Sequence, residues 1–170
     1  LMVIDFQNEY FNGRMPLPDA DKALNNARTL IAWADENQLP VLHVQHIAPA
    51  GSAVFATDGT TVQFHPLMQP REQDLVVQKD NVSVFVGTDV DAQLRSRNVD
   101  TLVIAGLMTH ACVAGAARDA APRGYHVVVA SDASATRDIT RANGECALAE
   151  IEDTFGDVLT TAQILQLPLR

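Results

Sequence analysis

The sequence predicts an α/β fold of three layers (α/β/α), in which helices cover both faces of an open, doubly wound and mostly parallel six-stranded sheet. Apolar segments of strand length alternate along the chain with segments of helical periodicity. The strand-like segments are apolar almost throughout, as expected of parallel strands that are covered on both faces. The length of 170 residues is typical of one domain, which we place at residues 1–170.

The first half of the chain holds three expected strands. Residues 1–4 (LMVI) are an apolar run, and residues 20–37 carry apolar side chains at helical spacing. The segments PVLHVQHI and DLVVQK predict the second and third strands. Residues 48–70 between them lack periodicity. A loop of this length in a compact domain usually has a function, so we expect it to form a lid or a pocket wall.

The second half continues the alternation of helix and strand. In chain order we expect a short helix over residues 89–98, a strand over 100–106, a helix over 109–123, a strand over 125–133, a helix over 140–153 and a last short strand over 157–161.

Composition and charge argue against several classes of protein. The net charge of -9 and the lack of Lys and Arg clusters disfavour binding to nucleic acid. No apolar run approaches the roughly 20 residues that span a bilayer, so we expect no membrane interaction. No secretion signal is visible before the first strand, and Cys112 and Cys146 do not make a disulfide framework. We therefore expect a cytoplasmic protein in which Cys146, in the middle of a helix, is a core residue.

Three chemically active side chains follow strands at the same expected edge of the sheet. Ligands of open α/β sheets bind outside the carboxyl ends of the strands. Asp5 follows the first strand, Lys79 follows the third, and Cys112 lies in the first turn of the helix after the fourth. A helix start and a nearby ammonium favour a thiolate, and a carboxylate can transfer the proton. The N–H groups of Met108 and Cys112 would form an oxyanion hole.

Each of these residues also has a structural interpretation. Cys112 could be a small buried side chain, Asp5 a turn or cap residue, and Lys79 a solvated surface lysine. The coincidence of all three at strand ends favours the catalytic interpretation.

Side chains on neighbouring loops and turns are candidates for a substrate pocket, with core packing or local hydrogen bonding as the alternative for each. These are Gln7, Phe11, His46, Phe55, Phe85, Leu107 and His110.

Four segments, in this order, carry a resemblance that covers nearly the whole chain. They are VIDFQNEY around Asp5, HPLMQPREQDLVVQKDNVSVF around Lys79, GTDVDAQLRSRNVDTLVIAGLMTHACVAGAARDA around Cys112, and GYHVVVASDASAT around Asp132. Together they resemble the isochorismatase-like cysteine hydrolases, the superfamily that includes nicotinamidases, carbamoyl-sarcosine amidohydrolases and isochorismatases.

The resemblance implies a hydrolase with an Asp, Lys, Cys catalytic triad, which carries onto Asp5, Lys79 and Cys112. It implies hydrolysis of a C–N bond in a small amide or ureide through a thioester. It also implies a non-proline cis peptide bond between Leu107 and Met108, and a homo-oligomer, a dimer or a tetramer. The small molecule itself is not identified by the sequence.

The sequence departs from the nicotinamidase pattern at the metal site. Those enzymes bind a divalent metal through an Asp, x, His motif after the second strand plus a later His. Here VQHIAPAG has His46 in the place of that Asp and no histidine two residues on. We therefore expect no metal and no cofactor, with a weak metal pair of His46 and His65 as the less favoured alternative.

Two other functions stay open. One is an isochorismatase-type ether hydrolase in which Cys112 is incidental. The other is a catalytically silent binding or scaffold member of the same fold, which intact Asp5, Lys79 and Cys112 disfavour. A dehydrogenase is less favoured still, because DFQNEYFNG after the first strand is not a glycine-rich phosphate turn.

Overall fold

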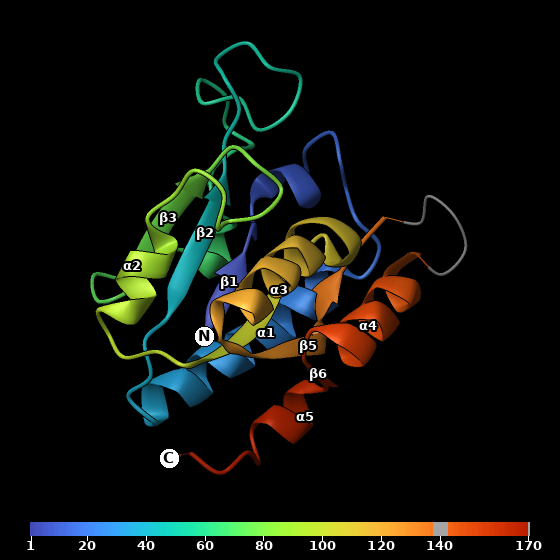
Figure 1. Cartoon of the computed structure of the whole chain (residues 1–170). Helices are drawn as coiled ribbons and strands as arrows, with labels where there is room; N and C mark the ends of the chain where they lie inside the picture. The colour runs from blue at the N-terminus through green and yellow to red at the C-terminus, as the bar shows by residue number, and fades with distance from the viewer. Residues whose placement is uncertain (138–142, 170) are drawn as a thin grey trace.

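The computed structural model describes residues 1–137 and 143–169 and contains a six-stranded sheet with the order β3-β2-β1-β4-β5-β6 (Figure 1). All of the strand pairings are parallel. The strands are β1 (Met2–Ile4), β2 (Leu42–His46), β3 (Leu75–Lys79), β4 (Thr101–Leu107), β5 (His126–Ala135) and β6 (Asp157–Leu159). The predicted fold class is confirmed, and the sheet is parallel throughout.

Helices cover both faces of this sheet, as Figure 1 shows. They are α1 (Ala20–Glu36), α2 (Val90–Arg95), α3 (Ala114–Ala120), α4 (Asn143–Thr154) and α5 (Thr161–Ile164). Alternate strand residues point to opposite faces. Val3 of β1 belongs to the core shared with α1 and α5, whereas Met2 and Ile4 belong to the core shared with α2, α3 and α4. The two cores make the molecule a three-layer structure.

The helix after β4 combines three helical geometries. The predicted helix over residues 109–123 is a π-helical turn (Thr109–Val113), then α3, then a 3-10 turn (Ala121–Arg123). The start of the helix predicted over residues 140–153 falls on residues 140–142, which lie outside the described residues, and the remainder corresponds to α4.

The end of the chain differs from the prediction. The strand expected over residues 157–161 stops at Leu159, because Thr160 caps the short helix α5, which was not predicted. The Thr160 hydroxyl accepts a hydrogen bond from the Gln163 N–H at 3.3 Å, and the Gln163 side chain accepts one from the Thr160 N–H at 2.8 Å. This reciprocal capping box favours a helix start over further extended chain.

The order of strands reverses between β1 and β4, and a glycine allows the two strands to approach closely there. A Cβ atom at Gly106 would lie 2.6 Å from Ile4 Cβ and 2.8 Å from the Ile4 carbonyl oxygen. Gly106 is paired with Ile4, the last residue of β1. The carboxyl ends of β1 and β4 therefore meet at the place where open α/β sheets bind ligands.

Residues 48–70 project beyond the carboxyl ends of the strands, at the top of Figure 1. The segment contains little regular structure. It has two isolated bridges, Gln7 with Phe64 and Ala48 with Ala56, and a 3-10 turn (Pro66–Met68). The segment is thus attached to the site edge by main-chain pairing. No helix within the described residues is long and apolar enough to cross a membrane.

Candidate active site

Asp5, Lys79 and Cys112 come together at the carboxyl edge of the sheet. Lys79 ends β3, Asp5 follows β1, and Cys112 lies in the π-helical turn after β4. Nζ of Lys79 is 3.1 Å from Oδ2 of Asp5 and 3.2 Å from Sγ of Cys112. The three residues are 0%, 2% and 6% exposed, respectively. Because β2 separates β3 from β1, the long lysine side chain has to cross a strand to reach Asp5.

The backbone of Asp5 is turned sharply at the end of β1. Its φ of 58° is left-handed, a conformation that aspartate tolerates better than most residues. The Asp5 N–H donates to the Val44 carbonyl at 2.9 Å, and the Asp5 carbonyl accepts from Gln7 N–H at 2.7 Å. Within the described residues, neither carboxylate oxygen receives a hydrogen bond of good geometry, despite the ion pair with Lys79. The carboxylate therefore retains free lone pairs for a proton.

The Lys79 ammonium has two further neighbours. Nζ lies 3.0 Å from Nδ1 of His46 and 3.1 Å from the carbonyl oxygen of Asn81. Burial lowers the pKa of Lys79, but attraction to Asp5 and to Cys112 outweighs that effect, so its pKa is raised above its ordinary value. Lys79 is therefore a cation at neutral pH.

The environment of Cys112 contradicts one expectation from the sequence. We expected the helix start and Lys79 to favour the thiolate. Instead, burial and the charge of Asp5 raise the pKa of the Cys112 thiol to about 12, and Lys79 opposes them only in part. At neutral pH the thiol is protonated and requires a base when it attacks a substrate.

The turn between β4 and Cys112 contains the expected cis peptide bond between Leu107 and Met108. The Met108 carbonyl accepts hydrogen bonds from the N–H groups of Ala111 at 3.1 Å and Val113 at 3.2 Å. The Met108 N–H itself has no hydrogen-bond acceptor among the described residues. This N–H is consequently available to a bound group, as an oxyanion-hole donor must be.

Two of the pocket candidates lie together beside Lys79. The rings of His46 and Phe55 meet edge to face with centroids 5.0 Å apart. Phe55 also meets Tyr10 edge to face at 5.2 Å. Phe11 lies on the loop after β1 with its ring 4.5 Å from that of His65. His46 is therefore the candidate that the structure brings against Lys79, and Phe55 packs against His46.

Two other pocket candidates have structural positions. Gln7 is fully buried, and its side-chain amide donates to the carbonyls of His46 at 2.8 Å and Val62 at 2.7 Å. Its Oε1 accepts from the His46 N–H at 2.9 Å, so the amide joins backbone segments. Leu107, at the end of β4 and before the turn that carries Cys112, is buried in the core. Both side chains lie in the protein interior.

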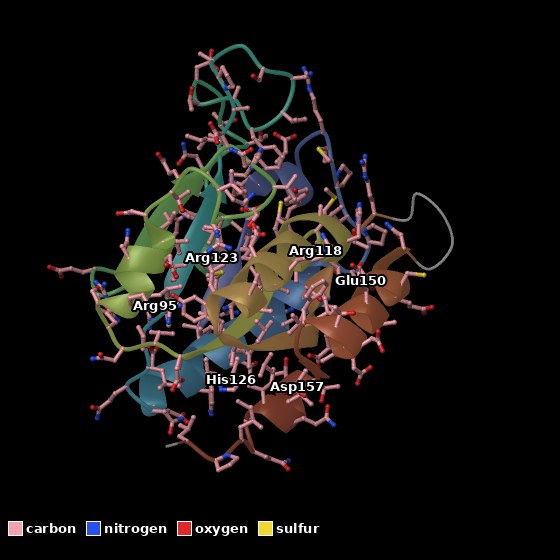
Figure 2. The ribbon with its side chains drawn as sticks, in the orientation of Figure 1. Arg95, Arg118, Arg123, His126, Glu150 and Asp157 are labelled. Carbon is pink, nitrogen blue, oxygen red and sulfur yellow. The ribbon has the colours of Figure 1, made fainter. Side chains whose placement is uncertain are left out.

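Phe85 and His110 make contacts with residues other than the three reactive groups. The Phe85 ring packs against Tyr125 at 6.0 Å and under the guanidinium of Arg123, which Figure 2 labels, at 5.0 Å. Tyr125 precedes β5, so Phe85 is near the amino end of that strand. Nδ1 of His110 contacts the hydroxyl of Thr136 and lies 3.3 Å from Nδ2 of Asn143.

Sequence reasoning missed two parts of the site. Tyr10 is buried and its ring packs against Phe55, and its pKa is raised by burial and then by the charges of Asp5 and Cys112. An aromatic residue five positions after Asp5 was the available signal. The Asn81 carbonyl could not be foreseen, because a backbone group has no residue-type signature. Cys146 was predicted as core but is exposed.

The described residues contain no group of three or more His, Cys, Asp or Glu side chains placed to hold a metal ion. Nδ1 of His46 faces Lys79, and Nδ1 of His65 accepts a hydrogen bond from the Leu67 N–H at 3.2 Å.

Comparison with known proteins gives matches over most of the chain. Residues 1–163 match the family model of the isochorismatase domain. The chain is 38% identical over 138 residues to the isochorismatase family protein YddQ of Bacillus subtilis, covering 80% of this chain and 77% of that protein. It is 32% identical over 168 residues to the secreted isochorismatase effector Isc1 of Verticillium dahliae, covering 96% and 88%. A streptothricin hydrolase of Streptomyces noursei is 34% identical over 144 residues, covering 85% and 57%.

Solved structures show the same fold. A cysteine hydrolase from Pseudomonas syringae pv. phaseolicola superposes with a TM-score of 0.90 at 26% identity, covering 97% of this chain and 89% of that one. The N-carbamoylsarcosine amidase from Thermoplasma acidophilum superposes with a TM-score of 0.83 at 27% identity, covering 94% of each chain.

Proposed function

The chain belongs to the isochorismatase family of hydrolases, and on that premise we propose that it is a cysteine hydrolase of small amides or ureides. The observation that carries the proposal is the position of the Lys79 ammonium, 3.1 Å from the Asp5 carboxylate and 3.2 Å from the Cys112 sulfur. A nucleophile, a base and a fixed cation are thereby within reach of one another in a buried site. Amidohydrolase relatives support a C–N bond as the target, since one is named a streptothricin hydrolase and another an N-carbamoylsarcosine amidase.

In the first step, Cys112 attacks the substrate carbonyl carbon as a neutral thiol. Its raised pKa, about 12, makes a preformed thiolate scarce at neutral pH. Asp5, whose carboxylate oxygens lack good hydrogen bonds within the described residues, takes the proton while the C–S bond forms. Lys79 stays protonated and stabilises the negative charge as it moves from Asp5 to the substrate oxygen.

The tetrahedral intermediate then collapses. Asp5 returns the proton to the substrate nitrogen, the C–N bond breaks, and ammonia or an amine leaves behind a Cys112 thioester. A water molecule attacks this thioester and gives a proton to Asp5. The C–S bond breaks, the proton passes from Asp5 to the sulfur, and the acid is released with the enzyme unchanged.

The negative charge on the substrate oxygen requires hydrogen-bond donors in both tetrahedral intermediates. The Met108 N–H, which has no acceptor among the described residues, is one donor in this proposal, and the Cys112 N–H is the other. Removal of one such donor typically costs about 3 kcal/mol of transition-state stabilisation.

A mass-spectrometric experiment tests the thioester. We expect rapid quenching during turnover of a panel of primary amides and ureides to trap an acyl adduct on Cys112. Cys112→Ala should lose the adduct and at least about a thousandfold of kcat/KM. Cys146→Ser is the matched control, because Cys146 is the exposed free cysteine, and it should keep both. An adduct that survives Cys112→Ala would contradict the proposal, and retained turnover of isochorismate by that variant would support ether hydrolysis instead.

A further inference from the structure

His46 is the closest partner of the Lys79 ammonium and is not one of the three proposed reacting groups. Among the described residues, Nζ has four polar neighbours, namely Nδ1 of His46 at 3.0 Å, Oδ2 of Asp5 and the Asn81 carbonyl at 3.1 Å, and Sγ of Cys112 at 3.2 Å. An ammonium has only three N–H bonds. The two neighbours that do not react, His46 and Asn81, therefore compete with Asp5 and Cys112 for the three N–H bonds.

We propose that His46 is a positioning residue, whose neutral imidazole holds the Lys79 ammonium between Asp5 and Cys112 and releases it when the imidazole is protonated. The inference rests on the proposed function, because it assigns a group that acts through Lys79 on the same site.

Strand pairing explains why the two side chains meet. His46 ends β2, and Lys79 lies directly opposite it in the parallel pairing of β2 with β3. Residues opposite each other in neighbouring strands point to the same face of the sheet. The imidazole therefore lies under the path of the lysine side chain as it crosses β2 toward Asp5.

The state of the ring follows from the charge of its partner. Lys79 is an ammonium and can only donate, so Nδ1 of His46 has to accept and cannot carry a proton. The proton of the neutral ring is consequently on Nε2. A second proton, on Nδ1, would direct an N–H group at the ammonium 3.0 Å away.

The backbone of His46 and its ring are each held by a neighbouring side chain. The Gln7 side chain accepts a hydrogen bond from the His46 N–H at 2.9 Å and donates one to the His46 carbonyl at 2.8 Å. The Phe55 ring, 5.0 Å away and nearly perpendicular, covers the imidazole. Rotation of the imidazole away from Lys79 would break this packing, which favours displacement of the lysine when the ring is protonated.

Several groups influence protonation of His46. Burial and the Lys79 charge disfavour the imidazolium, whereas Asp5, Asp80 and the Asn81 carbonyl favour it. The net result is a pKa of His46 below its ordinary value. The imidazole is therefore neutral at pH 7 and holds Lys79, and it releases Lys79 as the pH falls through this lowered pKa.

Kinetic pH profiles of two variants test the inference. His46→Asn keeps an acceptor near the place of Nδ1 but does not titrate, so we expect an acid limb of kcat/KM shifted to lower pH and a smaller loss of kcat at neutral pH than in His46→Leu. His46→Leu removes the acceptor, and we expect kcat to fall about 10- to 100-fold at all pH values with little change in KM. His126→Asn, at the start of β5 (Figure 2), is the matched histidine control and should leave the profile unchanged.

Nitrogen NMR of the wild-type protein provides a readout that needs no substrate. We expect the His46 resonances of the Nε2–H tautomer at pH 7, and an increase in the pKa of His46 in Lys79→Met, because the nearby cation is removed. If the protein hydrolyses no amide, the proposed function is wrong, but the NMR measurement still shows whether His46 accepts a hydrogen bond from Lys79. A proton on Nδ1 at pH 7, an unchanged pKa in Lys79→Met, or identical acid limbs in wild type and His46→Asn would overturn the inference.

Discussion

Asp5, Lys79 and Cys112 share a buried site in which the charge of each side chain depends on the other two. Lys79 is the only cation among them, and both Asp5 and Cys112 lie within 3.2 Å of its Nζ. One cation cannot fully stabilise two anions in a buried site, and the thiol is the weaker acid of the two acidic groups. Burial and the charge of Asp5 raise the pKa of the thiol, so Cys112 keeps its proton until a substrate is attacked.

Substitution of Asp5 should have opposite effects on thiol reactivity and on hydrolysis. In Asp5→Asn the like charge is gone, so we expect the pKa of Cys112 to fall by about 1 to 3 units and its alkylation by iodoacetamide at neutral pH to accelerate about tenfold or more. Amide hydrolysis should be lost, because no base or acid remains. Both rates are measured in a Cys146→Ser background, with Asp153→Asn as the control on the exposed end of α4. Slower alkylation of Asp5→Asn would show that the carboxylate does not raise the thiol pKa.

At the scale of elements, one buried carboxylate ties the loop over the site to the chain after β1. Oε1 of Glu9 accepts from the Arg14 N–H at 2.6 Å, and Oε2 accepts from the Phe55 N–H at 3.2 Å and the Thr61 hydroxyl at 2.6 Å. Burial raises the pKa of Glu9, but these hydrogen bonds outweigh burial, and the net pKa is lowered. The carboxylate form thus holds Phe55, which packs against His46, in place.

Glu9→Gln should loosen residues 48–70. The new amide would direct donor hydrogens at groups that themselves donate, so we expect the free energy of unfolding to fall by about 1 to 3 kcal/mol. Limited proteolysis should cut within residues 48–70 faster than in the wild type. Glu36→Gln, at the exposed end of α1, is the matched control. Equal unfolding curves and equal cleavage rates for the two variants would refute this role of Glu9.

At the scale of the whole molecule, the strand order brings together residues that are far apart in the sequence. The chain reverses direction across the sheet between β1 and β4, and this places the ends of those strands beside each other. The predicted dimer or tetramer, the single domain and the cytoplasmic location stay predictions. One relative, Isc1, is named a secreted effector.

Stability of the whole molecule should decrease on mild acidification. Burial lowers the pKa of His43 more than its contact with Asp74 at 3.2 Å raises it, and the pKa values of His46, His65 and His110 are also lowered by burial. A histidine with a lowered folded-state pKa binds fewer protons in the folded than in the unfolded state. Stability is therefore full above the unfolded pKa of about 6.5 and is lost as the pH falls through the folded pKa.

Urea unfolding at a series of pH values measures this effect. We expect a lower midpoint at pH 5 than at pH 7.5, and a smaller difference in His43→Gln, because the most buried of these imidazoles no longer titrates. His126→Gln is the matched control. A midpoint that stays constant over this pH range would contradict the prediction.

Local patterns were sufficient to predict the fold class, the order of the elements up to β6 and the three residues that meet at the site. Apolar runs and helical spacing reflect contacts within a few residues, and a residue that ends a parallel strand has to lie at one edge of the sheet. The same reasoning failed for Cys112, whose pKa depends on burial and on a carboxylate over a hundred positions away in the chain. For Phe85 the sequence left pocket lining and core packing open, and only the structure shows the contact with Tyr125.

Only the tertiary structure placed His46 against Lys79, left the Asp5 carboxylate without good hydrogen bonds among the described residues, and kept the Cys112 thiol protonated. These properties depend on distances between side chains from β1, β2, β3 and the turn after β4. Such distances are set by sheet order and packing, whereas residue type and spacing along the chain specify only which groups are present at the edge.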